Sequence, residues 1–518
     1  MKKTVLIVLG GTVLLLIILA GRVMYNIRDR HPDYQLAVDI RTGEAPLSIG
    51  ASAVAITPEI IDTWTDVNGD ARYNPDDGDT FQDRNNNGAF DPVWIAGFHK
   101  SRPATGIHDD LWARAMVIDN SQTRIAIVAL DAIGFMHDDV VDVRKMLPDS
   151  VEIDYAIISS THDHQAPDLI GIWGRNDYSC GVNDAYMRMV KKNIVTAIVQ
   201  ATRALRPARL RFAQDLAGAR PLVSDTRRPT VLDAGVRIMH AIDAEADTTL
   251  GTIVAWANHP ETLWNRNLMI SSDFPHFVRE YVEKGVVDSS GVFLPGLGGT
   301  VLYINGAVGG LMTTPPEQEV RSLSEFKVWR APTFDKIRAQ GERLAALVLS
   351  ALRGENVQEV TTAAVRVRAR TVVLPLANKG FRLGAMLGVI RRGFAGGFSM
   401  RSEVAALQLG PASFLAVPGE IYPEIINGGI EAPPGRDFDI QPVEVPPLRR
   451  FMPGEFRFVI GLANDEIGYI IPRSEWDEKP PYLYGAQESP YGEVNSLGPE
   501  TAPLLYTALR ELLADLEK

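Results

Sequence analysis

The chain has 518 residues, enough for one large domain or two to three ordinary ones. Its hydrophobic content of 46% and charged content of 22% are typical of a globular protein, and its net charge of −12 argues against a general nucleic-acid-binding protein, which would carry a basic face. The single cysteine, Cys180, excludes an intramolecular disulfide and a zinc site made of several cysteines.

The N-terminus predicts a membrane anchor. Lys2 and Lys3 precede an uncharged run, residues 4–21, that is rich in Leu, Val and Ile. As a helix this run would span roughly 27 Å, close to the hydrocarbon thickness of a bilayer. We interpret residues 1–21 as a signal anchor, with a signal peptide as the alternative, because no clear cleavage motif follows. Residues 22–47 are predicted to be a linker that tethers an extracytoplasmic (periplasmic or extracellular) globular part to the membrane.

Residues 48–518 predict one large α/β domain with mixed β-sheets flanked by helices, because strand and helix patterns alternate along the whole length without a second linker. Strands are predicted at 124–130, 153–160, 210–213, 235–239, 252–257, 301–304, 363–374, 405–409, 413–417 and 456–462. Helices are predicted at 138–146, 185–205, 274–283, 334–352 and 502–516.

An acidic insertion at residues 62–92 predicts a structural calcium loop. Its side chains repeat the spacing of positions 1, 3 and 5 of a calcium-binding loop, which supply the oxygen ligands that the cation needs. A solvated acidic loop without a cation is the alternative, although uncompensated carboxylates would repel one another. The predicted ligands are Asp66, Asn68, Asp70 and Asp77 in the first repeat, and Asp83, Asn85, Asn87 and Asp91 in the second.

Two histidines, His162 and His164, follow the predicted strand 153–160. In extended backbone they would point to the same side, as two metal ligands or as one ligand and an acid/base group. The chain has only 9 histidines, so their pairing favours chemistry over a polar turn. A third histidine, His259, also ends a predicted strand, where a structural role is equally compatible with the sequence. Glu420 follows a further strand and could be a ligand or a loop cap.

These segments together resemble the neutral/alkaline (non-lysosomal) ceramidase family. Gly106-Ile107-His108-Asp109-Asp110-Leu111-Trp112-Ala113-Arg114-Ala115 looks like an early family motif, and Thr161-His162-Asp163-His164 is similar to the family's Thr-His-Thr-His. Asn258-His259-Pro260, Pro418-Gly419-Glu420 and the segment 461–469 resemble later motifs, in family order. The resemblance runs from about residue 48 to the end and concerns the family's catalytic domain.

The resemblance implies a zinc ion held by His162, His259, Glu420 and Tyr469, and hydrolysis of an amide, or an ester, of a lipid-like N-acyl substrate by zinc-activated water. It assigns His164 to orienting the water or moving its proton, and it places a further active-site tyrosine at Tyr482 or the nearby Tyr484. Asp131, at the end of strand 124–130, is a candidate partner for one of the ligand histidines.

Two residues of the family motif are replaced in this chain, so two alternative functions stay open. An aspartate and a serine of the family correspond to Gly310 and Met312, which excludes that serine as a nucleophile. Asp131, Asn258 and His259 could instead bind two metals in a metal-dependent phosphoesterase. A third possibility is a non-catalytic, calcium-stabilised surface protein on a hydrolase scaffold.

Overall fold

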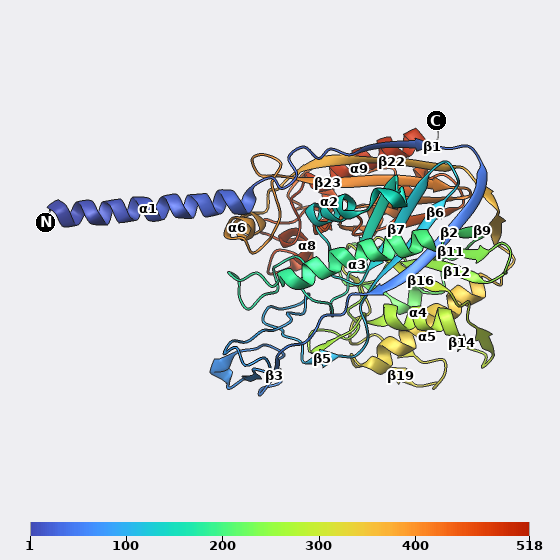
Figure 1. Ribbon diagram of the computed structural model, residues 1–518, viewed down its shortest axis with the longest axis horizontal. Helices are drawn as coiled ribbons and strands as arrows, with labels where there is room; N and C mark the ends of the chain where they lie inside the picture. The colour runs from blue at the N-terminus through green and yellow to red at the C-terminus, as the bar shows by residue number, and fades with distance from the viewer. Residues whose placement is uncertain (1, 517–518) are drawn as a thin grey trace.

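Two β-sheets packed face to face form the centre of the computed structural model, which describes residues 2–516 (Figure 1). The central strands β7 (Arg124–Leu130) and β8 (Tyr155–Ser160) are apolar over nearly their whole length because both of their faces are covered. Side chains of the two inner faces meet in one continuous core, in which Ile127, Phe212 and Phe458 take part. The predicted α/β fold is confirmed.

The larger sheet has the strand order β16-β12-β11-β9-β2-β6-β7-β8, and the smaller has β1-β22-β23-β24-β26. Both sheets are mixed, because β7–β8, β12–β16 and β24–β26 pair in parallel and the other neighbours on these paths are antiparallel. Their other strands are β1 (Ala37–Arg41), β2 (Ala45–Ala55), β6 (Trp112–Asp119), β9 (Arg206–Asp215), β11 (Val236–Asp243), β12 (Thr249–Trp256), β16 (Thr300–Asn305), β22 (Val365–Pro375), β23 (Ser399–Leu409), β24 (Ala412–Ala416) and β26 (Phe456–Ile460), with β20 (Gln358–Val360) and β21 (Thr362–Ala363) at the margins of the larger sheet.

Helices cover the outer face of each sheet, which gives four layers (Figure 1). Helices α3 (Asp184–Arg203), α4 (Phe274–Lys284) and α5 (Phe334–Ala351) lie on the larger sheet, and α9 (Thr501–Leu516) lies on the smaller one. The other helices are α1 (Lys2–Ile27), α2 (His137–Met146), α6 (Lys379–Leu387), α7 (Pro423–Asn427) and α8 (Tyr491–Val494). Short two- and three-residue strands complete the loops: β3 (Thr63–Thr65), β4 (Thr80–Gln82), β5 (Gly106–Ile107), β10 (Ser224–Asp225), β13 (Met269–Ile270), β14 (Gly285–Val287), β15 (Phe293–Pro295), β17 (Met312–Thr313), β18 (Val320–Arg321), β19 (Val328–Trp329), β25 (Glu420–Ile421) and β27 (Tyr469–Ile470).

The larger sheet curls so strongly that its first and last strands, β16 and β8, approach each other. Asn305 at the end of β16 connects them, because its side-chain amide donates to the carbonyl of Thr161 after β8 (2.9 Å) and to that of Asn258 after β12 (3.0 Å). The curl therefore brings together loops that would lie at opposite margins of a flat sheet.

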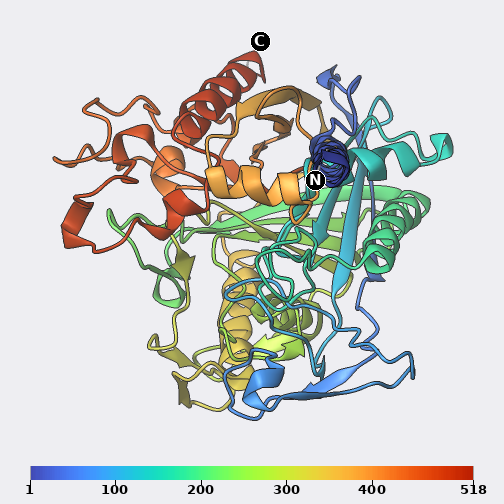
Figure 2. The ribbon, with the colours of Figure 1, turned by 90° about the vertical axis from the view of Figure 1, so that its left-hand side faces the viewer.

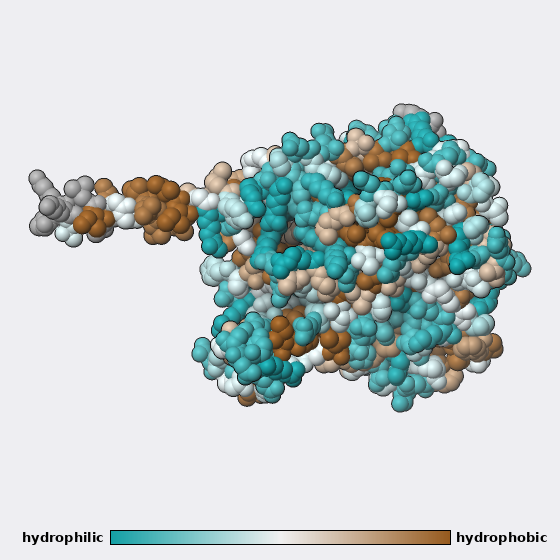
Figure 3. Space-filling view, viewed as in Figure 1, coloured by the Kyte–Doolittle hydropathy of each residue, from teal (hydrophilic) through white to brown (hydrophobic). Residues whose placement is uncertain are grey.

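Helix α1 projects from the body as a single extended rod (Figures 1 and 3). Its segment Leu9–Ile27 has a mean hydropathy of 1.6 and is long and apolar enough to cross a membrane; a signal sequence would pass the same test. The predicted linker, residues 22–47, differs from the structure: α1 continues to Ile27, β1 pairs with β22, and β2 has begun by Ala45. Backbone hydrogen bonds of sheet pairing thus order a segment whose polar composition suggested a tether.

Candidate active site

His162 lies in the loop that follows β8, with its side chain almost fully buried. Its backbone has a φ of +66°, so it is left-handed rather than extended as its position after the strand suggested. The Nδ1–H donates to the carbonyl of Ile133 at 2.6 Å, and Nε2 faces the Glu420 carboxylate at 3.3 Å. This tautomer leaves the Nε2 lone pair available for a metal.

His259 follows β12 and repeats the arrangement of His162. Its Nδ1–H donates to the carbonyl of Met312 at 2.7 Å, and its Nε2 lies 3.0 Å from the same Glu420 oxygen, Oε2. Met312 stands where the family has a serine, and its side chain is buried in the core while its carbonyl orients His259. The contact to His259 is made by the backbone of Met312 and therefore does not depend on the identity of that side chain.

Glu420 and Tyr469 lie side by side because they are paired residues of the short parallel strands β25 and β27. The sequence brings them together through β24 and β26, whose parallel pairing places the loops after both strands at one edge. Burial raises the pKa of Glu420, but His162 and His259 outweigh this and hold the pKa at about 2. Burial, and then Glu420, raise the pKa of the Tyr469 hydroxyl well above its usual range.

These contacts fit a small divalent cation. Two ligand atoms on a tetrahedral zinc ion would lie about 3.4 Å apart, close to the 3.0 and 3.3 Å that separate the two Nε2 atoms from Glu420 Oε2. The ligand nitrogens of His162, His164 and His259 lie within 4.8 Å of one another. Burial alone would lower the pKa of His162, but the negative charge of Glu420 outweighs this effect and raises the pKa. The Glu420 carboxylate therefore stabilises positive charge at this position.

His164 completes the cluster from the other side, with its ring centroid 4.9 Å from that of His162. Its Nδ1 is 3.2 Å from Oε2 of Glu261, yet neither ring nitrogen has a hydrogen-bond partner among the described residues. Burial, and then the neighbouring histidines, hold the pKa of His164 well below its usual range. A neutral imidazole with a free nitrogen can accept a proton or coordinate a ligand.

Tyr482 and Tyr484 do not line the cavity beside the histidines; Tyr491, at the start of α8, does. Its ring centroid is 5.9 Å from that of Tyr469, and burial raises its pKa to about 12. The sequence analysis did not identify Tyr491 or Glu261 as members of this site. Glu261 could have been noticed because it lies two positions after His259, whereas no local pattern marks Tyr491.

Asp131 does not contact a histidine, contrary to the prediction. Its carboxylate binds Arg279 at 2.8 Å and the backbone N–H of Trp112 at 3.0 Å. Backbone carbonyls, rather than a carboxylate, orient His162 and His259. Asp131, directly after β7, therefore forms an ion pair with α4 and a hydrogen bond with β6.

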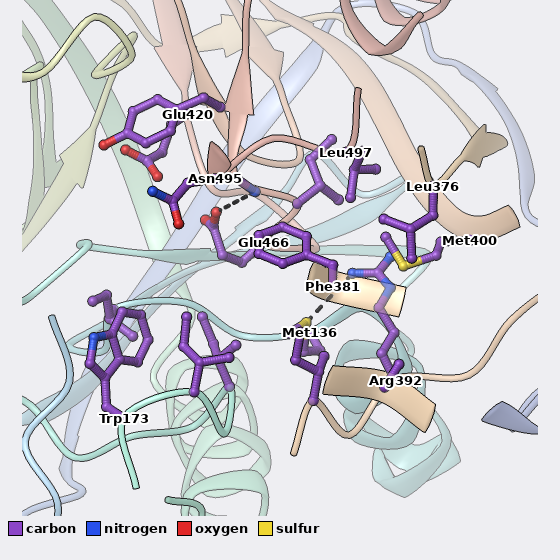
Figure 4. Close-up of a pocket in the computed structure, with 18 of the residues that line it drawn as sticks. Met136, Trp173, Leu376, Phe381, Arg392, Met400, Glu420, Glu466, Asn495 and Leu497 are labelled. Carbon is purple, nitrogen blue, oxygen red and sulfur yellow. Dashed lines mark hydrogen bonds between the residues drawn. The ribbon is translucent and has the colours of Figure 1, made fainter. Parts of the chain in front are cut away.

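A cavity opens beside the cluster and is lined mainly by apolar side chains (Figure 4). His162, His164, Glu420 and Tyr469 form its polar end. Its apolar wall includes Met136, Trp173, Leu376, Phe381, Met400 and Leu497. An apolar cavity that ends at a cluster of acid/base groups suits a substrate with a hydrocarbon chain and one reactive polar group.

One buried carboxyl group, Glu466, also lines this cavity (Figure 4). Its Oε1 accepts the N–H of Gly468 at 2.8 Å, while Oε2 has no hydrogen-bond partner among the described residues. Burial, and then the nearby Glu420, raise the pKa of Glu466 well above its usual range. Glu466 thus places a second buried carboxyl group close to the polar end.

The predicted calcium ligands gather into the two groups that their spacing indicated. In the first, Asp66 accepts the N–H groups of Gly69 and Ala71, both at 2.8 Å. The remaining members are linked by the Asn68 amide, which donates to Asp70 at 3.3 Å and to Asp77 at 3.5 Å.

The second group is arranged in the same way. Asp83 accepts the N–H of Gly88 at 2.8 Å, and Asp91 Oδ2 accepts the side-chain amides of Asn85 (2.8 Å) and Asn87 (2.6 Å). The short β3–β4 hairpin carries the first loop, and the second follows it. Calcium remains a prediction for both groups, whose side chains are exposed or half-buried.

Comparison with known proteins agrees with this picture. Residues 87–292 match the family model described as neutral/alkaline non-lysosomal ceramidase, N-terminal. No curated protein matches the chain. Among solved structures, the neutral ceramidase from Pseudomonas aeruginosa aligns with a TM-score of 0.63 at 16% identity, over 91% of this chain and 74% of that one. A ceramidase complexed with C2 aligns with a TM-score of 0.62 at 16% identity, over 91% and 75%. The resemblance predicted from the sequence is confirmed: residues 87–292 match the neutral/alkaline non-lysosomal ceramidase model, and the chain shares the fold of the solved neutral ceramidase.

Proposed function

We propose that the chain is a zinc-dependent hydrolase that cleaves the amide bond, or the corresponding ester bond, of a ceramide-like N-acyl lipid. The family match and the fold support a ceramide hydrolase. The observation that carries the proposal is the convergence of His162, His259 and Glu420 at one end of an apolar cavity. Such a cavity suits a lipid chain, and the cluster suits hydrolysis of a bond at the end of that chain.

His162, His259 and Glu420 would hold the metal, with Tyr469 as the fourth or displaceable ligand. A zinc ion bound there supplies Lewis-acid polarisation of the carbonyl and lowers the pKa of a coordinated water to about 7. The carbonyls of Ile133 and Met312 fix both imidazoles with Nε2 inward, so little reorganisation is needed to bind.

His164 is the group that we assign to proton transfer. Burial and the neighbouring histidines hold its pKa well below the usual range, and neither of its nitrogens has a hydrogen-bond partner in the part of the chain that the structure describes. The reaction requires a base for the attacking water and an acid for the departing amine. Glu261, 3.2 Å from His164 Nδ1, would stabilise the imidazolium after it has accepted the proton.

Two tyrosines border the polar end, and their assignment follows from position. Tyr469 and Tyr491 both line the cavity, and burial raises the pKa of each hydroxyl. A neutral phenol donates a hydrogen bond to an oxygen that becomes negative during attack on the carbonyl. Tyr491 therefore takes the role that the resemblance gave to Tyr482.

The test is the His162→Ala variant of the full-length chain, assayed with fluorogenic N-acyl sphingoid amides, the matching esters and alkyl phosphate esters. We expect about one zinc per wild-type chain by mass spectrometry, turnover of the amide, and loss of both in the variant. His276→Ala is the matched control, because His276 lies on α4 and does not line the cavity.

Full amide turnover by His162→Ala would contradict the proposal. Two transition-metal ions per chain, with turnover of the phosphate ester alone, would indicate the phosphoesterase instead. Wild-type protein that binds zinc but turns over none of the three substrates would favour the non-catalytic role. An unchanged melting temperature in His162→Ala would separate loss of chemistry from loss of fold.

A further inference from the structure

Helix α6 (Lys379–Leu387) has two apolar faces, and only one of them is covered. Phe381 and Ala385 point into the candidate active site and line its cavity (Figure 4). On the other side Leu383 is 51% exposed and Leu387 is 42% exposed. These two leucines are four residues apart and therefore form one continuous strip on the helix surface.

The end of α1 is fastened to this helix. The side-chain amide of Asn26 donates to the carbonyl of Met386 at 2.9 Å, and the N–H of Phe394 donates to the carbonyl of Ile27 at 3.2 Å. Ile27 also packs against the apolar core that surrounds the cavity. Figure 2, viewed toward the N-terminus, shows α6 directly beside the base of α1.

This attachment fixes where a bilayer would lie. The apolar segment Leu9–Ile27 would span roughly 28 Å as a helix, which matches the hydrocarbon core of a membrane. If α1 crosses the bilayer, its last turn is at the membrane surface, and α6 is bonded to that turn. The exposed leucines of α6 then lie next to the membrane surface.

The charge around the strip suits that position. The α6 sequence contains Lys379 and Arg382 and no acidic residue. Arg382 lies over the ring of Phe398 at 4.4 Å, and Phe398 is itself 39% exposed. Exposed leucine and phenylalanine beside basic side chains are the composition of helices that bind the surface of anionic membranes.

We propose that α6 is a membrane-docking helix, whose Leu383–Leu387 strip lies in the headgroup region of the bilayer that holds α1. Its opposite face forms a wall of the cavity, so docking places that cavity beside lipid. A lipid substrate can then pass from the bilayer into the cavity without crossing bulk water. The docking itself depends on α1 and α6 and holds whether or not the chain hydrolyses ceramide.

The position of α6 can be measured with single-cysteine variants of the full-length chain. Cys180→Ser removes the one native thiol, and Leu383→Cys, Leu387→Cys or Val328→Cys introduces one site for an environment-sensitive fluorophore. Val328 on β19 is the matched control, because it is also 42% exposed but lies away from α1 (Figure 1). The labelled protein is reconstituted into phosphatidylcholine–phosphatidylglycerol vesicles with nitroxide-labelled lipid.

We expect severalfold stronger quenching by the lipid nitroxide at positions 383 and 387 than at 328, and the reverse order with aqueous iodide. Quenching at 383 and 387 equal to that at 328 would overturn the proposal. Protection from both quenchers would also overturn it, because a protein, such as a second copy of the chain, would then cover the strip. Equal melting temperatures of the labelled variants establish that each is folded.

Lys379→Glu tests the charge component separately. Replacing a basic with an acidic residue at a membrane surface should reduce the docked fraction about fivefold in phosphatidylglycerol vesicles, with little change in pure phosphatidylcholine. If Lys379→Glu and the unsubstituted protein showed the same quenching by the lipid nitroxide in phosphatidylglycerol vesicles, Lys379 would have no role in docking. Because these measurements use no substrate, their failure is distinct from failure of the proposed hydrolase activity.

Discussion

The two candidate cation sites of this protein are built in opposite ways. At the histidine cluster, His259 and Glu420 are 161 positions apart, are buried and are brought into contact by two sheets. In the acidic insertion, all of the candidate ligands come from residues 62–92, and all are exposed or half-buried. The first site therefore depends on the whole fold, whereas the second depends on local spacing and the charge of its own loop.

This difference predicts what each site loses without its cation. The histidines are oriented by the carbonyls of Ile133 and Met312, so their geometry should persist without metal. The acidic loops use Asp66 and Asp83 to accept their own backbone N–H groups, which leaves the other carboxylates to repel one another unless a cation is present. Metal removal should thus affect chemistry at one site and local structure at the other.

Selective chelation should have the largest effect and is the most direct way to break the comparison. A zinc-selective chelator should lower turnover by about a hundredfold or more, since losing even one stabilising group in a transition state costs that much. The melting temperature should change little. A calcium-selective chelator should lower the melting temperature and leave turnover nearly unchanged. The measurements are turnover and thermal unfolding on the same sample, and equal loss of activity with both chelators would contradict independent sites.

Asn305→Ala should have the next largest effect. Of the two candidate cation sites, it should affect only the histidine site. The Asn305 side chain donates to Thr161 and Asn258 and accepts the N–H groups of Asn258 and Gly306. Alanine would leave these buried groups unpaired and should cost about 3 kcal/mol of unfolding free energy. A displacement of the histidines by 1 Å would lower kcat by roughly a hundredfold.

Asn305→Asp is the matched variant, because it keeps the acceptor oxygen and removes the amide donors. We expect intermediate stability and activity, measured by urea unfolding and steady-state kinetics. Calcium affinity of the acidic loop should be unchanged in both variants. If Asn305→Ala had wild-type kcat, the curl of the larger sheet would not be what positions the histidines.

The same contrast explains how much could be predicted from sequence. Strand β7 was expected at residues 124–130, which are its bounds in the structure, because it forms a continuous apolar run. The acidic groups were identified by spacing alone, because their members are close in sequence. Neither prediction needed any knowledge of tertiary contacts.

Features that depend on distant contacts could not be predicted in this way. Strand β2 was missed because Ala45–Ala55 is made largely of small residues, and α6 was missed because two glycines interrupt its apolar pattern. The left-handed conformation of His162 and the position of Tyr491 follow from the packing of loops from separate sheets. Family resemblance supplied the proposed ligand set, and the structure supplies the orientation of each imidazole.

Acid should break a buried ion pair of the fold, between Asp233 and Arg449, which has no counterpart among the predicted calcium ligands. Burial raises the pKa of Asp233, but Arg449 and Arg237 outweigh it and bring the pKa from 3.8 to about 2. Because the folded pKa is depressed, this stabilisation is present above pH 3.8 and is lost as the pH falls through 2. It amounts to about 2 kcal/mol.

Asp233→Asn should therefore reduce the unfolding free energy at pH 7 and flatten its fall between pH 4 and 2. Asp439→Asn is the control, since its carboxylate is fully exposed. Urea unfolding across this pH range measures both. An unchanged slope in Asp233→Asn would mean that the ion pair with Arg449 does not contribute to acid stability.

Asp91→Asn should have the smallest effect and sharpens the comparison most, because it removes one charge and keeps the shape of the side chain. Its Oδ2 accepts from both Asn85 and Asn87, so Asp91 is the member that joins the second acidic group. We expect weaker calcium binding by titration calorimetry and faster proteolysis within residues 83–91, with a stability change below about 1 kcal/mol. Asp76→Asn, an exposed acid of the same insertion outside the predicted ligands, should leave calcium binding unchanged. Equal calcium affinity in wild type and Asp91→Asn would mean that the second group is a hydrogen-bonded turn, and that any calcium bound by the insertion is held by the first group.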